Sequence, residues 1–215
     1  EEHAPQLILR GVAVWDALCL GRTWARLEGK GAHMPFIDHQ GRRSLFVHIP
    51  KTGGTSIETW LKGIGPLRLY RNGIPQALKV SAQHLTYTDI RLILGDDYFD
   101  YGFTIVRNPF RRLESEYRMR SDLATDGVLG RVAVFPVWVR TQIEMMQKAV
   151  FHQDGHFRPQ IDYVSNHIEI FRFEEGIDSI IAKVSAKTGL PMPAETPHEM
   201  RPRRYDAARH GALEW

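Results

Sequence analysis

A lysine, two glycines and several hydroxyl side chains lie together between a predicted strand and a predicted helix. Residues 45–49 form an apolar run typical of a strand buried on both faces, and residues 57–62 have a helical pattern. The connection contains Lys51, Thr52, Gly53, Gly54, Thr55 and Ser56. Glycines at such a turn let backbone N–H groups approach an oxyanion closely, and the helix N-terminus adds partial positive charge. The stretch therefore predicts a phosphate-like cradle, in which Lys51 supplies a point charge.

An arginine and a serine form a second set of residues that suits an anion. Arg107 directly follows an apolar run, 101–106, that predicts another buried strand. Its planar guanidinium is suited to bidentate phosphate binding, and Pro109 favours the start of a helix just beyond it. Ser115 lies one helical turn after Arg111, so both should face the same ligand. We therefore expect a second anionic group to be held directly by the protein.

Strands alternating with helices must bring these residues together. The predicted strands are 45–49, 78–80, 101–106 and 168–173. The predicted helices are 57–62, 86–94, 109–118, 135–150 and 177–188. This alternation predicts an α/β fold with a doubly wound parallel sheet, in which ligands bind beyond the carboxyl ends of the strands. Lys51, His84 and Arg107 each follow a predicted strand, so we expect them to converge at one edge of the sheet.

Length and composition are those of one ordinary domain. The chain has 215 residues, 43% apolar residues, one cysteine and a formal net charge of +3. We expect a single domain over 1–215, with an N-terminal appendage at 1–43, a core at 44–190 and an irregular tail at 191–215. A single cysteine excludes a disulfide framework, and no stretch approaches the roughly 20 apolar residues that span a bilayer. The expectation is a cytoplasmic protein with no membrane span, no nucleic-acid motif and no metal site.

The order of residues argues against a nucleoside triphosphate as the anion. In the Walker A pattern the lysine follows the glycines, whereas Lys51 precedes Gly53 and Gly54. A kinase or GTPase also needs an acidic residue for magnesium after a later strand, and the strand 101–106 ends in Arg107 instead.

Two long motifs resemble sulfotransferases that use 3′-phosphoadenylyl sulfate (PAPS). Residues 46–56, Phe-Val-His-Ile-Pro-Lys-Thr-Gly-Gly-Thr-Ser, are similar to the family's 5′-phosphosulfate loop. Residues 106–117, Val-Arg-Asn-Pro-Phe-Arg-Arg-Leu-Glu-Ser-Glu-Tyr, are similar to its 3′-phosphate motif. Weaker matches are His-Phe-Arg-Pro-Gln at 156–160 and Phe-Arg-Phe-Glu at 171–174. The closest branch contains the heparan sulfate 2-O-sulfotransferases and small bacterial relatives. The resemblance covers 44–190, while the tail departs from the family pattern.

The resemblance implies a fold, a donor and a role for each residue. It implies a P-loop-NTPase-like three-layer fold and a metal-independent transfer of the sulfuryl group of PAPS to a hydroxyl, leaving adenosine 3′,5′-bisphosphate. Lys51 would stabilise the leaving group, while residues 52–56, Arg107 and Ser115 would bind the donor. The family places a catalytic histidine after its second strand, which His84 matches, and a positioned histidine is the usual base for an alcohol. The acceptor would be a carbohydrate or a small metabolite.

Several alternatives stay open from sequence. The protein could be a P-loop nucleotide phosphotransferase, or a non-catalytic module that retains the cradle. His48 lies inside a strand and favours a structural role. His156 and Gln160 would either orient the acceptor or stabilise their loop. Three arginines on the 109–118 helix could either contact a ligand or pair with Glu114 and Glu116. They are Arg111, Arg112 and Arg118. Pairing is favoured most for Arg112. The Arg-rich stretch 201–209 favours a solvated tail.

Overall fold

A five-stranded sheet forms the centre of the molecule. The computed structural model describes residues 33–69, 79–95, 97–125, 127 and 132–197. The strands are β1 (His33–His39), β2 (Arg42–Val47), β3 (Arg68–Leu69), β4 (Tyr101–Val106) and β5 (Glu169–Arg172). Their order across the sheet is β3-β1-β2-β4-β5. β2, β4 and β5 are parallel neighbours, with Phe46 opposite Phe103 and Ile105 opposite Phe171. These strands form the parallel part of the sheet that the sequence predicts.

The first strand runs against the others. β1 pairs antiparallel with both β2 and β3, so four of the five described strands share one direction. A two-residue connection, Gln40-Gly41, joins β1 to β2, and both residues have positive φ, as a tight hairpin turn requires. The expectation of an all-parallel sheet is therefore wrong at this edge. The expected core boundary at residue 44 is also too late, because residues 33–43 belong to the sheet.

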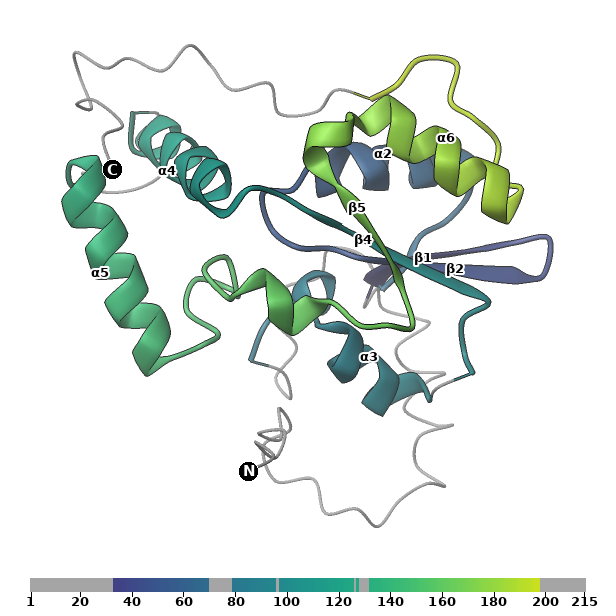
Figure 1. The fold of residues 1–215 in the computed structure, drawn as a ribbon, viewed down its shortest axis with the longest axis horizontal. Helices are drawn as coiled ribbons and strands as arrows, with labels where there is room; N and C mark the ends of the chain where they lie inside the picture. The colour runs from purple at the N-terminus through teal and green to yellow at the C-terminus, as the bar shows by residue number, and fades with distance from the viewer. Residues whose placement is uncertain (1–32, 70–78, 96, 126, 128–131, 198–215) are drawn as a thin grey trace.

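Helices cover both faces of the sheet, as Figure 1 shows. α2 (Gly54–Ile64) and α6 (Ile177–Thr188) lie on one face, and α3 (Tyr87–Leu94) lies on the other. Phe46, Trp60 and Ile180 represent the buried cluster on the first face. Leu45 and Ile90 belong to the buried cluster on the second face. The α/β class with flanking helices is thereby confirmed.

Two further helices extend to one side of the sheet. α4 (Pro109–Thr125) and α5 (Phe135–Lys148) pack through a third cluster that includes Tyr117, Phe135 and Trp138. α4 starts as predicted: Asn108 Oδ1 accepts the N–H groups of Phe110 and Arg111, 3.1 and 3.2 Å away. It ends later than predicted, because residues 121–125 continue the helix.

The segment before His84 differs from the prediction. Residues 79 and 80 form a bend rather than a strand, and a short 3-10 helix, η1 (Ala82–His84), follows. Residue 78, most of the expected appendage (1–32) and most of the expected tail (198–215) lie outside the described residues. Two more 3-10 helices are η2 (Gln160–Tyr163) and η3 (Phe173–Glu175). No helix among the described residues is both long enough and apolar enough to cross a membrane.

Candidate functional site

A cavity of about 560 Å³ opens where β2, β4 and β5 end. Its volume lies within the range of small-molecule sites, roughly 300–1,000 Å³. Lys51, Arg107 and Phe173 reach it from the segments that follow these three strands, and His84 reaches it from η1. The predicted site residues that line it are Lys51, Gly53, Gly54, Thr55, Ser56, His84, Arg107 and Ser115. The structure therefore brings together segments that the sequence analysis expected to converge.

Thr52, a further predicted site residue, does not line the cavity. It is fully buried, and its hydroxyl donates to the Ile49 carbonyl at 2.8 Å. This bond closes the turn at the base of the cradle. Thr52 is thus placed to shape the loop.

The cradle depends on close backbone approach at its two glycines. Gly53 has a φ of 86°, and a Cβ there would lie 2.8 Å from both Phe173 and Ile177. A Cβ on Gly54 would overlap the imidazole of His48. Lys51 also has positive φ, 69°, a conformation that is costly for a residue with a side chain. The loop is therefore a specialised backbone shape, which begins α2 with its N-terminus at the cavity.

Arg107 is held rigidly at the cavity wall. Its Nη1 donates to the Lys51 carbonyl at 3.1 Å, and its guanidinium lies 4.4 Å from the centre of the Phe173 ring. Its backbone is fixed by Gln160, whose amide accepts the Arg107 N–H at 2.9 Å and donates to the Arg107 carbonyl at 2.7 Å. Gln160 does not line the cavity, so the structure favours its loop-stabilising role.

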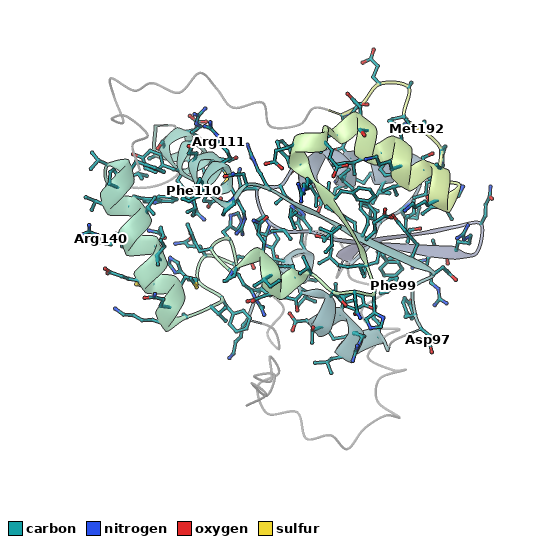
Figure 2. The ribbon with its side chains drawn as sticks, viewed as in Figure 1. Asp97, Phe99, Phe110, Arg111, Arg140 and Met192 are labelled. Carbon is teal, nitrogen blue, oxygen red and sulfur yellow. The ribbon has the colours of Figure 1, made fainter. Side chains whose placement is uncertain are left out.

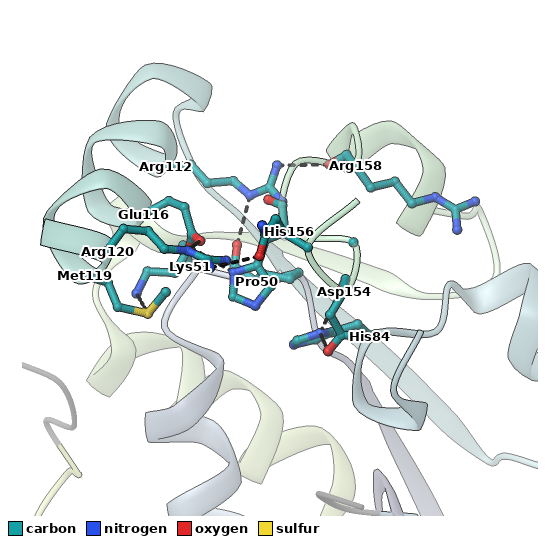
Figure 3. Close-up of polar contacts among 12 residues, drawn as sticks. Pro50, Lys51, His84, Arg112, Glu116, Met119, Arg120, Asp154, His156 and Arg158 are labelled. Atoms are coloured by element: carbon teal, nitrogen blue, oxygen red, sulfur yellow. Dashed lines mark hydrogen bonds and ion pairs between the residues drawn. The ribbon is translucent and has the colours of Figure 1, made fainter. Parts of the chain in front are cut away.

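Positive charge dominates the lining of the cavity. Its cationic side chains are Lys51, Arg107, Arg111 and Arg118, against one carboxylate, Glu114. Arg111 pairs with Glu114 at 2.9 Å, as the helix spacing predicts. Burial lowers the pKa of Lys51, Glu116 counteracts this shift, and Arg107 adds to it. The Lys51 Nζ donates to the sulfur of Met119 at 3.4 Å (Figure 3). The cavity is thus suited to a ligand with several negative charges.

His84 is paired with a carboxylate that the sequence analysis missed. Its Nδ1 lies 2.9 Å from Asp154 Oδ2 and 3.0 Å from the Asp154 carbonyl (Figure 3). Ser81 also donates to Asp154, through its N–H at 2.6 Å and its hydroxyl at 2.8 Å. Burial alone would raise the pKa of Asp154, but the bonds from His84 and Ser81 lower it. An ionised Asp154 only accepts hydrogen bonds, so His84 donates to it through Nδ1–H, and in the neutral imidazole Nε2 is the acceptor nitrogen.

Two further histidine–carboxylate pairs flank His84. His48 bonds through Nδ1 to the buried Glu58, to which Gln83 donates at 2.7 Å. His156 bonds through Nδ1 to Glu116 at 2.9 Å. The His84 ring meets the rings of His48 and His156 edge-on, with centroids 5.4 and 5.1 Å away. All three imidazoles line the cavity, although the described residues contain no group of three ligands that could hold a metal ion.

Glu116 is a buried charge shared between two partners. It also accepts from Arg120 Nε at 2.8 Å. Burial would raise the Glu116 pKa, but His156, Arg120 and Lys51 lower it to about 2. Burial lowers the pKa of His156, and Glu116 counteracts this shift. The carboxylate is therefore ionised, and His156 donates to it.

Arg112 does not pair with a glutamate, contrary to the sequence-based preference. It is buried, and its guanidinium donates to three backbone carbonyls, those of Pro50 at 2.9 Å, His156 at 2.8 Å and Arg158 at 3.0 Å. Arg120, rather than Arg112, takes Glu116 as its i,i+4 partner. The only sequence signal for this arrangement was the spacing of Arg112, Glu116 and Arg120, which places them on one face of α4.

No protein-family model, curated protein or solved structure matches this chain. The residues and their geometry therefore carry the functional argument by themselves.

Proposed function

We propose that this protein is a PAPS-dependent sulfotransferase that transfers a sulfuryl group to a hydroxyl. The observation that carries the proposal is that one cavity collects the Lys51 cradle, Arg107 with Ser115, and the His84–Asp154 pair. A reaction between a polyanionic donor and a neutral alcohol needs these three kinds of group. They come from separate stretches of the chain and meet beyond the strand ends, as in a P-loop-like α/β fold.

The cavity residues fit the donor that the sequence resemblance implies. PAPS carries anionic groups at both its 5′ and 3′ positions, and the cavity offers a cationic side chain for each, Lys51 and Arg107. The glycines let the backbone of the cradle pack directly against His48 and Phe173, where a Cβ would clash, and this gives the loop its shape. The helix N-terminus supplies amide dipoles directed at an anion. Lys51, the 53–56 backbone, Arg107 and Ser115 would hold the donor.

The protein's own groups would then divide the work of the reaction. When bound, PAPS supplies a sulfuryl group activated by a phosphate leaving group. The Lys51 ammonium, which lines the cavity and contacts the Met119 sulfur, would stabilise negative charge on that phosphate. Nε2 of His84 would accept the proton of the attacking hydroxyl, and Asp154 would stabilise the resulting imidazolium through Nδ1–H. Binding both reactants in one cavity would place the hydroxyl for in-line attack on the sulfuryl group.

A binding measurement and a transfer assay together test this function. Adenosine 3′,5′-bisphosphate should raise the melting temperature, and at about 100 times its Kd it should add about 2.7 kcal/mol of stability. Labelled PAPS should then transfer its sulfuryl group in a screen of carbohydrate, phenol, lipid and peptide acceptors. We expect Lys51→Ala to reduce turnover greatly, Arg107→Ala to weaken donor binding, and His84→Asn to abolish transfer while binding persists.

A control variant and three alternative outcomes complete the test. Arg140→Ala removes an exposed arginine on the outer side of α5, labelled in Figure 2, and should change neither readout. Nucleotide binding without transfer to any acceptor class would favour a non-catalytic module. Magnesium-dependent turnover of ATP would favour a phosphotransferase. Full activity of both Lys51→Ala and Arg107→Ala would overturn the proposal.

A further inference from the structure

The partner of His84 lies in a backbone turn of unfavourable conformation. Gln153, Asp154 and Gly155 have consecutive φ values of 52°, 58° and 75°. Left-handed backbone suits glycine but is unfavourable for the other two residues. The turn matters for the site because Asp154 offers both its carboxylate and its carbonyl to His84 Nδ1. Something must hold this turn in place.

One face of α4 supplies the contacts that hold it. Arg112, Glu116 and Arg120 are spaced by four residues, and we call them the α4 ridge (Figure 3). Arg120 Nη1 donates to the Gln153 side chain at 2.9 Å, immediately before Asp154. Glu116 accepts from the His156 ring, immediately after the turn. The ridge therefore contacts the chain on both sides of Asp154.

Arg112 extends the ridge to the cradle. It donates to the His156 and Arg158 carbonyls and also to the carbonyl of Pro50, the residue before Lys51. The bond between Arg120 and Glu116 joins the other two members. One helix face thus fixes the position of the His84 partner relative to the position of Lys51.

We propose that the α4 ridge positions His84 by holding the 153–155 turn, so that Asp154 keeps the His84 proton on Nδ1 and Nε2 faces the reaction. Ridge residues are positioning residues, because they act through Asp154. The catalytic consequence rests on the proposed function, whereas the effect on the His84 proton does not.

The most direct test combines a ridge variant with a substitution that removes the conformational cost of the 153–155 turn. Arg120→Ala removes the contact with Gln153, and Gln153→Gly removes the conformational cost that the contact opposes. Imidazole ¹⁵N chemical shifts report which nitrogen of His84 carries the proton, and the resonances missing from His84→Asn assign them. We expect Nδ1–H in the unmodified protein, a mixture of tautomers in Arg120→Ala, and recovery of Nδ1–H in the double variant.

Turnover should follow the same pattern. A positioned base contributes about 10²–10⁴-fold to rate, and we expect Arg120→Ala to lose about tenfold in kcat with an unchanged KM for PAPS. Gln153→Gly alone should have little effect and should restore most of the loss in the double variant. Arg140→Ala is the matched arginine control, and a thermal unfolding curve without ligand verifies that each variant is folded. If Arg120→Ala does not fold, Arg120→Lys, which keeps a cation for Glu116, provides the same comparison.

Each outcome decides one of the two proposals. An unchanged His84 tautomer in Arg120→Ala, or in Arg120→Lys where the alanine variant does not fold, would overturn the role of the ridge. A change that Gln153→Gly does not reverse would overturn the role of the turn. If the unmodified protein transfers no sulfuryl group, the proposed function fails, and the ¹⁵N shifts still test the ridge.

Discussion

The two glycines of the cradle show how single residues shape this site. His48 occupies the space next to Gly54, where its ring is held by Glu58. The His48–Glu58 pair therefore packs against the cradle backbone, and His48 directly follows β2, which ends at Val47, rather than lying inside the strand as predicted. Gly53 is restricted separately by Phe173, which also lies against Arg107.

Two alanine substitutions in α2 should therefore have opposite effects. In Gly54→Ala the new Cβ overlaps the His48 ring, and we expect a loss of about 1–3 kcal/mol, typical of overpacking, together with loss of nucleotide binding. Gly63→Ala has nothing within 4 Å of the new Cβ and should gain about 0.5–1 kcal/mol from helix propensity. Urea unfolding of both variants measures the difference, and equal stabilities would contradict the packing argument.

At the level of elements, β1 is the largest departure from the prediction. Its hairpin with β2 places Ile37 in the core beneath α2 and α6, with no exposed surface. The sequence predicted an appendage here, because the glycine-rich segment 29–33 resembles a linker. Pairing with β2, which is far stronger evidence than local composition, shows that β1 belongs to the domain.

A substitution in β1 tests its contribution to the core. Ile37→Ala should lower the free energy of unfolding by about 2–5 kcal/mol, because it removes buried methyl groups and leaves a cavity. Asp38→Ala, at the next and exposed position, should change it by less than about 0.5 kcal/mol. Chemical denaturation of both variants is the measurement. A negligible effect of Ile37→Ala would mean that β1 is dispensable for the fold.

For the whole molecule, ligand binding depends more on where the charges lie than on the net charge. The formal net charge is only +3, yet four cationic side chains and one carboxylate line the cavity. Low-dielectric walls concentrate the potential of such a cleft. Among the described residues, positive side chains therefore gather at this cavity, as the proposed anionic donor would require.

Nucleotide affinity should consequently depend on salt. The Debye length falls from about 10 Å at 0.1 M salt to about 3 Å at 1 M, so we expect Kd for adenosine 3′,5′-bisphosphate to rise about tenfold over this range. Calorimetric titration at several salt concentrations measures the slope. Arg107→Gln should weaken binding and reduce the slope, whereas Arg140→Gln on α5 should leave both unchanged. A Kd independent of salt would exclude electrostatic capture by the cavity.

The parts of the site that depend on neighbouring residues in the chain could be predicted from the sequence. The glycines after β2 and the Arg107-Asn108-Pro109 helix start could be predicted, because turns and helix caps are determined by neighbouring residues. His84 was also placed at the correct edge, although the strand expected before it is absent at residues 79 and 80.

The sequence by itself determined an α/β chain, and it predicted a glycine-containing cradle and a second cationic group, Arg107, at one edge of the sheet. Only the tertiary structure decided that Asp154 pairs with His84, 70 residues away, and that Glu116 pairs with His156, 40 residues away. It also decided that Arg112 bonds to backbone rather than to a neighbouring glutamate. Local backbone preferences act over a few residues, whereas these partners are chosen by packing between distant segments.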